Sequence, residues 1–293
     1  MQQSKLDTGQ MVGKVCLITG SSSGIGEFTA IGLAELGASV VMACRDQAKG
    51  EAAREDVIRL SGAKKDDVDL MLVELASLDS VRELSSNFRK QYNRLDVLIN
   101  NAGLILGERM ATKDGLEATF QVNYLSHFLL TNLLLDTLKA SAPSRIISVS
   151  SDASQRASID FEDLQCEKSY SSFRAYGQSK LAQILFTYEL ARKLEGTGVT
   201  ANCLHPGLVA SNWGRHSAGA LSFFLRFAGP FSLTPRKGAD TPVYLASSPE
   251  VATVTGKYFT KRQPVQSSKA SYDEAAAKRL WQVSLSLAKL NDW

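Results

Sequence analysis

Residues 19–26 have the sequence TGSSSGIG and directly follow the apolar run 15–18, VCLI. Three glycines and three serines cannot pack a core, and an ordered glycine carries an entropic cost. In an open parallel sheet, ligands bind beyond the carboxyl ends of the strands. A glycine-rich turn between a strand and a helix places free backbone N–H groups and the positive end of the helix dipole around an anion. The stretch therefore predicts a phosphate-binding turn in a parallel α/β sheet.

The glycines of this turn follow the spacing G-x-x-x-G-x-G, which departs from the G-x-G-x-x-G fingerprint of dinucleotide-binding turns. Thr29 stands where the last glycine of the fingerprint would fall. A turn without a ligand is therefore the alternative interpretation. The serines are expected to cap the following helix or to donate hydroxyl groups to a ligand. The predicted contacts of the turn are Gly20, Ser21, Ser22, Ser23, Gly24, Ile25 and Gly26.

Short β-branched runs alternate with longer helical patterns along the chain. Apolar strands that alternate with helices predict a parallel sheet covered on both faces. The sequence has no internal repeat and no linker, so we expect one domain over residues 1–293 with a doubly wound, parallel, seven-stranded sheet. The predicted strands are Val15–Thr19, Ser39–Ala43, Val68–Leu75, Val97–Asn100, Arg145–Val149, Thr200–Leu204 and Lys257–Phe259, and the predicted helices cover 25–36, 46–60, 78–92, 115–140 and 176–195.

The composition is that of a globular protein, with 44% hydrophobic and 22% charged residues in a chain of 293. The net charge of +3 comes from scattered residues, which argues against nucleic-acid binding. The four cysteines form no C-x-x-C and the three histidines form no H-E-x-x-H, so we expect neither a metal site nor disulfides. The N-terminus lacks the apolar core of a signal peptide, and no apolar run is long enough to span a bilayer. We expect a soluble, cytoplasmic protein, and the oligomeric state stays open.

Tyr176 and Lys180 stand four residues apart at the predicted start of a helix. At this spacing a phenol and an ammonium group lie on one helix face. An isolated phenol has a pKa of about 10, and a nearby cation is expected to lower it by roughly 1–3 units. Tyr176 would then serve as a general acid or base. The alternative is a surface Tyr and Lys that share helical spacing by chance.

Polar residues recur at the predicted carboxyl ends of several strands. The segment 148–151, SVSS, ends the fifth strand, the segment 100–103, NNAG, follows the fourth, and the segment 205–207, HPG, follows the sixth. Because these ends meet at one edge of a parallel sheet, we expect a single site there. At the end of the second strand, a carboxylate would bind the ribose of NAD, whereas an Arg accommodates the 2′-phosphate of NADP. Arg45 therefore favours NADP(H), with a solvated surface arginine as the alternative.

Together, the segments TGSSSGIG, NNAG, QVNYLSHF, SVSS, YGQSK and HPG resemble the short-chain dehydrogenase/reductase family from Lys14 to about Phe259. The resemblance implies a Rossmann-type fold and a catalytic tetrad. Ser151 would hold the substrate oxygen, and Tyr176 would be the acid/base. Lys180 would bind the nicotinamide ribose and tune the phenol, and Asn123 would maintain a water-linked proton path. Beyond the glycine turn, the implied cofactor contacts are Arg45, Glu74, Leu75, Asn100, Ala102, Gly103, Tyr176, Lys180, Pro206, Gly207 and Val209, with Glu74 in place of the family's usual Asp.

The segments ACRDQAKGE, LSHFLLTNLLL and GKYF, and the 25-residue gap from Ser151 to Tyr176, resemble the retinol dehydrogenase branch and its bacterial relatives. This implies hydride transfer between NADP(H) and a hydrophobic carbonyl or alcohol, retinal-like or another aldehyde or ketone. Light-dependent protochlorophyllide reductase shares VVMACRD and LASLDSVR, but it typically carries a cysteine soon after the lysine, where this chain has Leu181, Ala182 and Gln183. A rival from another class is a non-catalytic NADP-binding redox sensor or scaffold.

The stretch 205–250 interrupts the alternation and is predicted to be a substrate-covering insertion. Within it, residues 212–234, NWGRHSAGALSFFLRFAGPFSLT, gather aromatic and aliphatic side chains among glycines. We interpret this segment as a lid that excludes water from hydride transfer. The alternatives are a helix packed permanently on the core and a patch that contacts a membrane surface.

Overall fold

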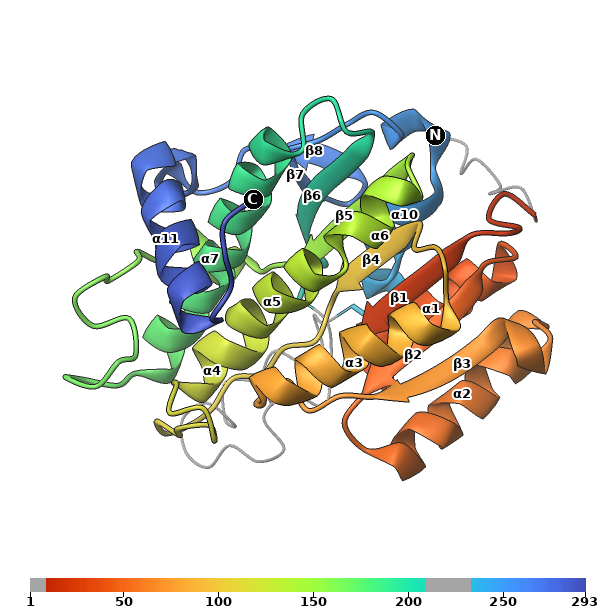
Figure 1. Ribbon diagram of the computed structural model, residues 1–293, viewed down its shortest axis with the longest axis horizontal. Helices are drawn as coiled ribbons and strands as arrows, with labels where there is room; N and C mark the ends of the chain where they lie inside the picture. Colours follow the sequence, from red (N-terminus) through yellow and green to blue (C-terminus); the bar gives the residue numbers. More distant parts are fainter. Residues whose placement is uncertain (1–8, 209–232) are drawn as a thin grey trace.

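In the described part of the chain, residues 9–208 and 233–293 of a computed structural model, eight strands form one sheet (Figure 1). They are β1 (Val15–Thr19), β2 (Ser39–Cys44), β3 (Val68–Leu72), β4 (Val97–Asn100), β5 (Ser144–Val149), β6 (Val199–His205), β7 (Tyr258–Thr260) and β8 (Gln263–Val265). Their order is β3-β2-β1-β4-β5-β6-β7-β8. The first seven run parallel, and β8 pairs antiparallel with β7. The predicted α/β fold is confirmed, with one edge strand more than expected.

Helices cover both faces of this sheet. They are α1 (Gly24–Glu35), α2 (Gln47–Ser61), α3 (Leu78–Gln91), α4 (Ala118–Phe120), α5 (Ser126–Leu133), α6 (Leu135–Ala140), α7 (Ser172–Lys193), α9 (Pro235–Gly238), α10 (Asp240–Ser247) and α11 (Glu274–Leu287). One core lies against α3, α5, α7 and α11 and contains Phe128 and Trp281. The other lies against α1, α2 and α10 and contains Leu33 and Val243. Figure 1 shows α3, α5 and α7 side by side in front of the sheet. The chain is therefore doubly wound.

The helix α2 shows how local sequence sets the element boundaries. Its N-cap residue Asp46 accepts a hydrogen bond from the backbone N–H of Lys49 at 3.0 Å. At the other end, Gly62 has φ of 71°, and its N–H donates to the carbonyl of Ile58. Asp is a favoured N-cap, and glycine tolerates the left-handed conformation that ends a helix. The helix is consequently closed at both ends by its own residues.

The strand order reverses direction between β1 and β4, which are neighbours in the sheet. In doubly wound sheets the crevice at such a switch point is where ligands bind. The turn after β1 begins at Gly20, and the turn after β4 begins at Asn101. The fold therefore brings the TGSSSGIG and NNAG segments side by side at the switch point, where the Asn101 amide donates to the Thr19 carbonyl at 2.8 Å.

Three helical segments differ from the prediction. The helix expected to begin at Tyr176 begins at Ser172, so Tyr176 lies in its second turn. The expected helix 115–140 consists of α4, a π-helical turn η2 (Gln121–Leu125), α5 and α6. The wider π turn explains the break, because it changes the register of the residues that follow. The helix α11 was not predicted, and it places Trp281 in the core beside Phe128 at a ring distance of 5.1 Å.

Both outer edges of the sheet carry groups that limit further strand pairing. On β3, the Arg54 guanidinium donates to the carbonyl of Val68 at 2.6 Å, and the Asp69 carboxylate accepts from the N–H of Leu70 at 2.8 Å. At the other edge, the short strand β8 contains Pro264, which has no backbone N–H. Side chains and a proline thus occupy or remove hydrogen-bonding groups along the two edges.

The predicted insertion 205–250 is described in part. Its helices α9 and α10 pack on α1, and Val243 lies in the core with an exposure of 8%. Val209 and nearly all of the predicted lid fall within residues 209–232, outside the described residues. The substrate-covering role of this region stays a prediction. Among the residues that are described, no helix combines the length and the apolar composition needed to cross a bilayer.

Candidate active site

The glycines after β1 let two turns approach closely. Gly20 has φ of +66°, and a Cβ there would lie 2.8 Å from the Cα of Ala102 in the turn after β4. A Cβ on Gly26 would lie 2.4 Å from the carbonyl oxygen of Gly20. Gly24 has φ of +62°, and an added Cβ there would have no atom of the described residues within 4 Å. The turn thus packs on protein at Gly20 and Gly26, whereas at Gly24 it leaves space for a ligand.

The serines of this turn have different surroundings. Ser21 is fully buried, and its hydroxyl lies 3.5 Å from the carbonyl oxygen of Ala43. Ser22 hydrogen-bonds to Cys44. Ser23 is the exposed N-cap residue of α1, and its side chain makes no cap hydrogen bond, contrary to the expected capping. Because α1 begins without a side-chain cap, its first-turn N–H groups suit an anion such as a pyrophosphate.

Asn100 adds an acceptor at the end of β4. Its Nδ2 donates to Thr131 at 3.0 Å, whereas its buried Oδ1 has no hydrogen-bond partner among the described residues. Asn101 lies on the other side, where its Nδ2 donates to the carbonyl of Thr19 at 2.8 Å. A buried polar atom without a partner is costly and suggests a group that is satisfied by a ligand or water. This observation and the open glycine turn fit a dinucleotide at the switch point.

The tip of β2 carries Arg45, as predicted for the adenosine end of the cofactor. The Arg45 Nε lies 3.7 Å from the Glu74 carboxylate, and both side chains are exposed. Leu75 is buried, and its carbonyl accepts from the Ser126 hydroxyl at 2.6 Å. Exposed ion pairs of this kind contribute little to stability. Arg45 is therefore available to an anion that approaches the tip.

Ser151, Tyr176 and Lys180 of the predicted tetrad lie close together. Ser151 follows β5 as the N-cap residue of the short helix η3 (Asp152–Arg156), and it hydrogen-bonds to Tyr176. The Lys180 Nζ lies 5.6 Å from the centre of the Tyr176 ring. Asn123 joins them indirectly, because its Nδ2 donates at 2.9 Å to the Ser179 hydroxyl, one residue before Lys180. The fold thus brings the tetrad positions to one place from β5, η2 and α7.

Burial dominates the protonation of this cluster. It raises the pKa of the Tyr176 phenol well above the ordinary value, although the hydrogen bond with Ser151 acts against it. Burial also lowers the pKa of Lys180 to about 7. The predicted lowering of the Tyr176 pKa is therefore wrong, because burial of the phenol outweighs the favourable contact that helical spacing places nearby. At neutral pH the phenol keeps its proton and can donate it.

Asn123 has both ends of its amide engaged. Its Oδ1 accepts from the Leu104 N–H at 2.7 Å, and its Nδ2 donates to the Leu104 carbonyl at 2.9 Å as well as to Ser179. These bonds tie the segment after β4 to α7. Asn123 lies in the π-helical turn, a feature that is frequent at functional sites. Its role in a water-linked proton path stays a prediction.

A buried hydrogen-bond chain that the sequence did not predict links the two turns to Asn123. The Thr19 hydroxyl accepts from the N–H groups of Asn101 and Ala102 at 3.0 and 3.1 Å. It lies 2.9 Å from the Nε2 of His127, whose Nδ1 lies 3.0 Å from the Asn123 carbonyl. The carbonyl only accepts, so Nδ1 carries the proton and Nε2 accepts from Thr19. Burial lowers the pKa of His127 to about 4, which fits this neutral form.

Acid is expected to destabilise the fold through His127. Its pKa is 6.5 in an ordinary setting and about 4 in the folded chain, so only the unfolded chain gains a proton between these values. The stabilisation is complete above about pH 6.5, and up to roughly 3 kcal/mol is lost as the pH falls toward 4. Urea unfolding at a series of pH values measures this slope. In His127→Gln, which keeps an acceptor near Thr19, the slope should be much smaller. An unchanged slope would assign the acid sensitivity to other groups.

A second cluster, which includes His205 of the predicted HPG segment, holds the segment that carries Ser151. The His205 Nε2 lies 3.0 Å from the Asp152 carboxylate, and the Tyr258 hydroxyl donates to the other carboxylate oxygen at 3.3 Å. The hydrogen bond with His205 keeps the pKa of Asp152 below its ordinary value. These contacts connect η3 to β6 and β7. Pro206 and Gly207 follow directly, with φ of +90° at Gly207.

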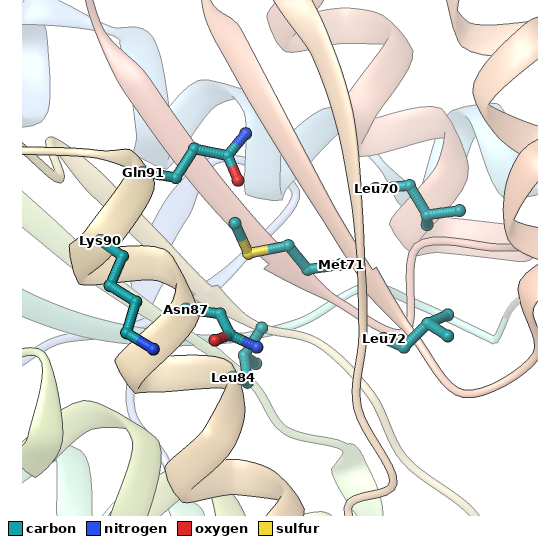
Figure 2. A pocket seen from close by; sticks show the side chains of 7 residues that line it. All are labelled: Leu70, Met71, Leu72, Leu84, Asn87, Lys90 and Gln91. Atoms are coloured by element: carbon teal, nitrogen blue, oxygen red, sulfur yellow. The ribbon is translucent and has the colours of Figure 1, made fainter.

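A hollow of about 600 Å³ lies away from this site (Figure 2). The edge strand β3 and the facing helix α3 form this hollow. In the sheet, β2 separates β3 from β1, the strand that precedes the glycine turn. Its lining includes none of the predicted site residues. The lining consists of Leu70, Met71, Leu72, Leu84, Asn87, Lys90 and Gln91.

Comparisons with known proteins agree with this geometry. A family model described as short chain dehydrogenase matches residues 14–219. Retinol dehydrogenase 14 of Mus musculus is 48% identical over 294 residues, covering 97% of this chain and 88% of the mouse protein. The crystal structure of an uncharacterized protein from Mycobacterium paratuberculosis has a TM-score of 0.78 at 34% identity, covering 96% of this chain and 95% of that one. The Pseudomonas aeruginosa RhlG/NADP active-site complex has a TM-score of 0.68 at 30% identity, covering 86% and 96%.

Proposed function

The chain belongs to the short-chain dehydrogenase family, in its retinol dehydrogenase branch, and from this premise we propose that it transfers a hydride between NADP(H) and a hydrophobic carbonyl or alcohol, with Tyr176 as the acid/base. The main support for this proposal is that Ser151 hydrogen-bonds to Tyr176 and that Lys180 lies beside the Tyr176 ring. Of these residues, Ser151 follows β5, and Tyr176 and Lys180 lie in α7. The open glycine turn follows β1, a strand of the same sheet. Carbonyl reduction requires a proton donor and a dinucleotide site close together, and both are expected at the carboxyl ends of these strands.

The mechanism assigns a task to each side chain. When bound, the nicotinamide cofactor supplies or accepts the hydride. Ser151 binds the substrate oxygen by a hydrogen bond and so orients the carbonyl group toward Tyr176. Tyr176 donates its phenolic proton to that oxygen in reduction and removes it in alcohol oxidation. Because burial raises the pKa of Tyr176, the phenol carries its proton at neutral pH, as proton donation to a carbonyl oxygen requires.

The proposed hydrophobic substrate is supported by the relatives, several of which are named retinol dehydrogenases. A retinal-like aldehyde and a generic aldehyde or ketone both meet the chemistry described above. The test is an activity panel of retinal and of aliphatic and aromatic aldehydes and ketones, with NADPH or NADH. Turnover of none of these by a chain that still binds NADPH would favour the non-catalytic sensor. The cytoplasmic location stays a prediction.

The proposed preference for NADP(H) is supported by charges at the tip of β2. Arg45 is exposed there, and the adjacent Asp46 carboxylate is engaged as the N-cap of α2. No other acidic residue lies between the end of β2 and Glu51 in the sequence. Glu74 competes for the Arg45 guanidinium only at 3.7 Å and in exposed surroundings. One related structure is named as an NADP complex.

Replacing Arg45 with Ala is expected to raise the Kd of NADPH by about 10- to 100-fold and to leave that of NADH nearly unchanged, because a charge-assisted Arg–phosphate bond is lost. Fluorescence titration of the purified variants with both cofactors measures this. Arg59→Ala serves as the control, since Arg59 is an exposed arginine near the opposite end of α2 and pairs with Asp56. Equal losses for both cofactors in Arg45→Ala would contradict a contact with the 2′-phosphate.

A further inference from the structure

Gln183 lies almost one helical turn after Lys180 in α7, and both side chains are buried, with exposures of 1% and 2%. The Lys180 ammonium donates to the Gln183 Oε1 at 2.9 Å and to the Val149 carbonyl at 2.9 Å. The sequence pattern assigns no role to this glutamine. Two neutral oxygens, one from α7 and one from the end of β5, therefore receive the ammonium.

The orientation of the Gln183 amide is set by this contact. A lysine ammonium has donors and no acceptor, so the amide must present its oxygen to it. The Gln183 Nε2 is consequently buried, and it has no hydrogen-bond partner among the described residues. An unpaired buried donor is unfavourable, and an apolar side chain of similar size would avoid it. Packing alone thus does not explain an amide at this position.

We propose that Gln183 is a positioning residue, whose amide oxygen holds the Lys180 ammonium beside Tyr176 together with the Val149 carbonyl. The inference rests on the proposed function, with Lys180 in the role that the family resemblance implies for it, binding the nicotinamide ribose. Hydrogen bonds to an ammonium favour its charged form, whereas burial disfavours it. Gln183 therefore acts on the reaction through Lys180 and does not itself contact the reacting atoms.

The surroundings of Lys180 make its protonation sensitive to one acceptor. On its own helix it faces Tyr176, a neutral phenol at neutral pH. From α5 it is near His127, which is neutral at that pH and whose pKa Lys180 lowers further. The contact from β5 is an uncharged carbonyl. Burial is the cause of the lowered pKa of Lys180, about 7, and no charged partner among the described residues opposes it. Loss of the acceptor at Gln183 should thus lower this pKa, and a negative charge at the same position should raise it.

Two nearly isosteric substitutions test the proposal in the chain without cofactor. The protein is labelled with 13C at the lysine Cε, and the Lys180 resonance is identified by its loss in Lys180→Met. In Gln183→Met, the NMR titration midpoint of Lys180 should fall by about one pH unit, because one acceptor is gone. In Gln183→Glu, it should rise by at least about one pH unit, because a carboxylate stabilises the ammonium.

The pH profile of turnover gives a second readout. The basic limb of kcat/KM should move to lower pH in Gln183→Met and to higher pH in Gln183→Glu. Gln178→Met is the control, because Gln178 is a buried glutamine of the same helix that binds the 157–171 segment through Asp160 and Leu164. This control should leave the Lys180 titration unchanged. Circular dichroism checks the folding of each variant. If Gln183→Glu does not fold, it is replaced by Gln183→Asn, which keeps a shorter amide. The titration midpoint of Lys180 should fall less in Gln183→Asn than in Gln183→Met.

Unchanged Lys180 midpoints in the folded Gln183 variants, or shifts of equal sign in Gln183→Met and Gln183→Glu, would overturn the proposal. The NMR titration needs no turnover, so it decides the role of Gln183 even if the substrate panel yields no activity. A failed panel would count against the proposed function alone. The two outcomes are therefore separable.

Discussion

Replacing Tyr176 with Phe is expected to lower kcat by at least about 10²-fold while the Kd of NADPH changes little. The substitution removes only the hydroxyl that hydrogen-bonds to Ser151, and the ring keeps its place in α7 near Lys180. Without the hydroxyl, the developing alkoxide of a reduced carbonyl has no positioned proton donor. Steady-state kinetics on the best substrate of the panel and fluorescence titration with NADPH measure the two quantities.

Tyr188→Phe is the matched control for this prediction. Tyr188 is a buried tyrosine of the same helix, and its hydroxyl lies 2.7 Å from that of Ser267, away from the tetrad. The same chemical change there should cost stability through a lost hydrogen bond and leave kcat within roughly a factor of three. Full turnover by Tyr176→Phe would refute its assignment as the acid/base. A comparable loss in both variants would indicate a structural effect on α7.

Replacing Gly26 with Ala is expected to weaken NADPH binding by at least about tenfold and to destabilise the fold by about 1–3 kcal/mol. The new methyl group would lie 2.4 Å from the carbonyl oxygen of Gly20 and 2.5 Å from the Asn101 Nδ2. The Gly20 carbonyl can yield only if the turn after β1 moves, and the Asn101 amide only if its hydrogen bond to the Thr19 carbonyl is disturbed. Isothermal titration with NADPH and urea unfolding would measure the two effects.

Two other glycines separate turn distortion from general loss of stability. Gly32 lies in the same helix, and a Cβ there would meet the Val243 side chain of α10 at 2.8 Å. Gly32→Ala should therefore destabilise the packing of α1 on α10 and leave NADPH affinity nearly intact. In Gly107→Ala the new methyl group meets no atom of residues 9–208 and 233–293 within 4 Å, so this variant should be close to neutral in both assays. If Gly26→Ala binds NADPH as well as Gly107→Ala does, the turn does not hold the cofactor.

The features that the sequence predicted correctly depend on patterns within a few consecutive residues. Buried parallel strands leave continuous apolar runs, and the turn after β1 needs glycine where φ is positive, as at Gly20 and Gly24. The positions of Ser151, Tyr176 and Lys180 follow from motifs of a few residues. Helix α11 also has a local signal, since Ala277, Leu280 and Trp281 share one face at helical spacing.

What could not be predicted depends on contacts between distant segments. Thr19 and His127 are 108 positions apart, so their hydrogen bond has no local pattern. The effect on the Tyr176 pKa was predicted with the wrong sign, because helical spacing gives the distance to Lys180 but not the burial of either group. Gln183 is ordinary in sequence and becomes significant only through its contact with Lys180. Burial and pairing of polar groups thus require the tertiary structure.

The two sheet edges described above also bear on how copies of the chain meet one another. An open edge strand is a template onto which another molecule can add a strand, a common route to aggregation. Here Arg54 and Asp69 engage backbone groups of β3, and Pro264 interrupts the donors of β8. Sheet growth from one molecule to the next is therefore disfavoured at both ends. The two edges thus oppose the strand addition that begins fibril formation.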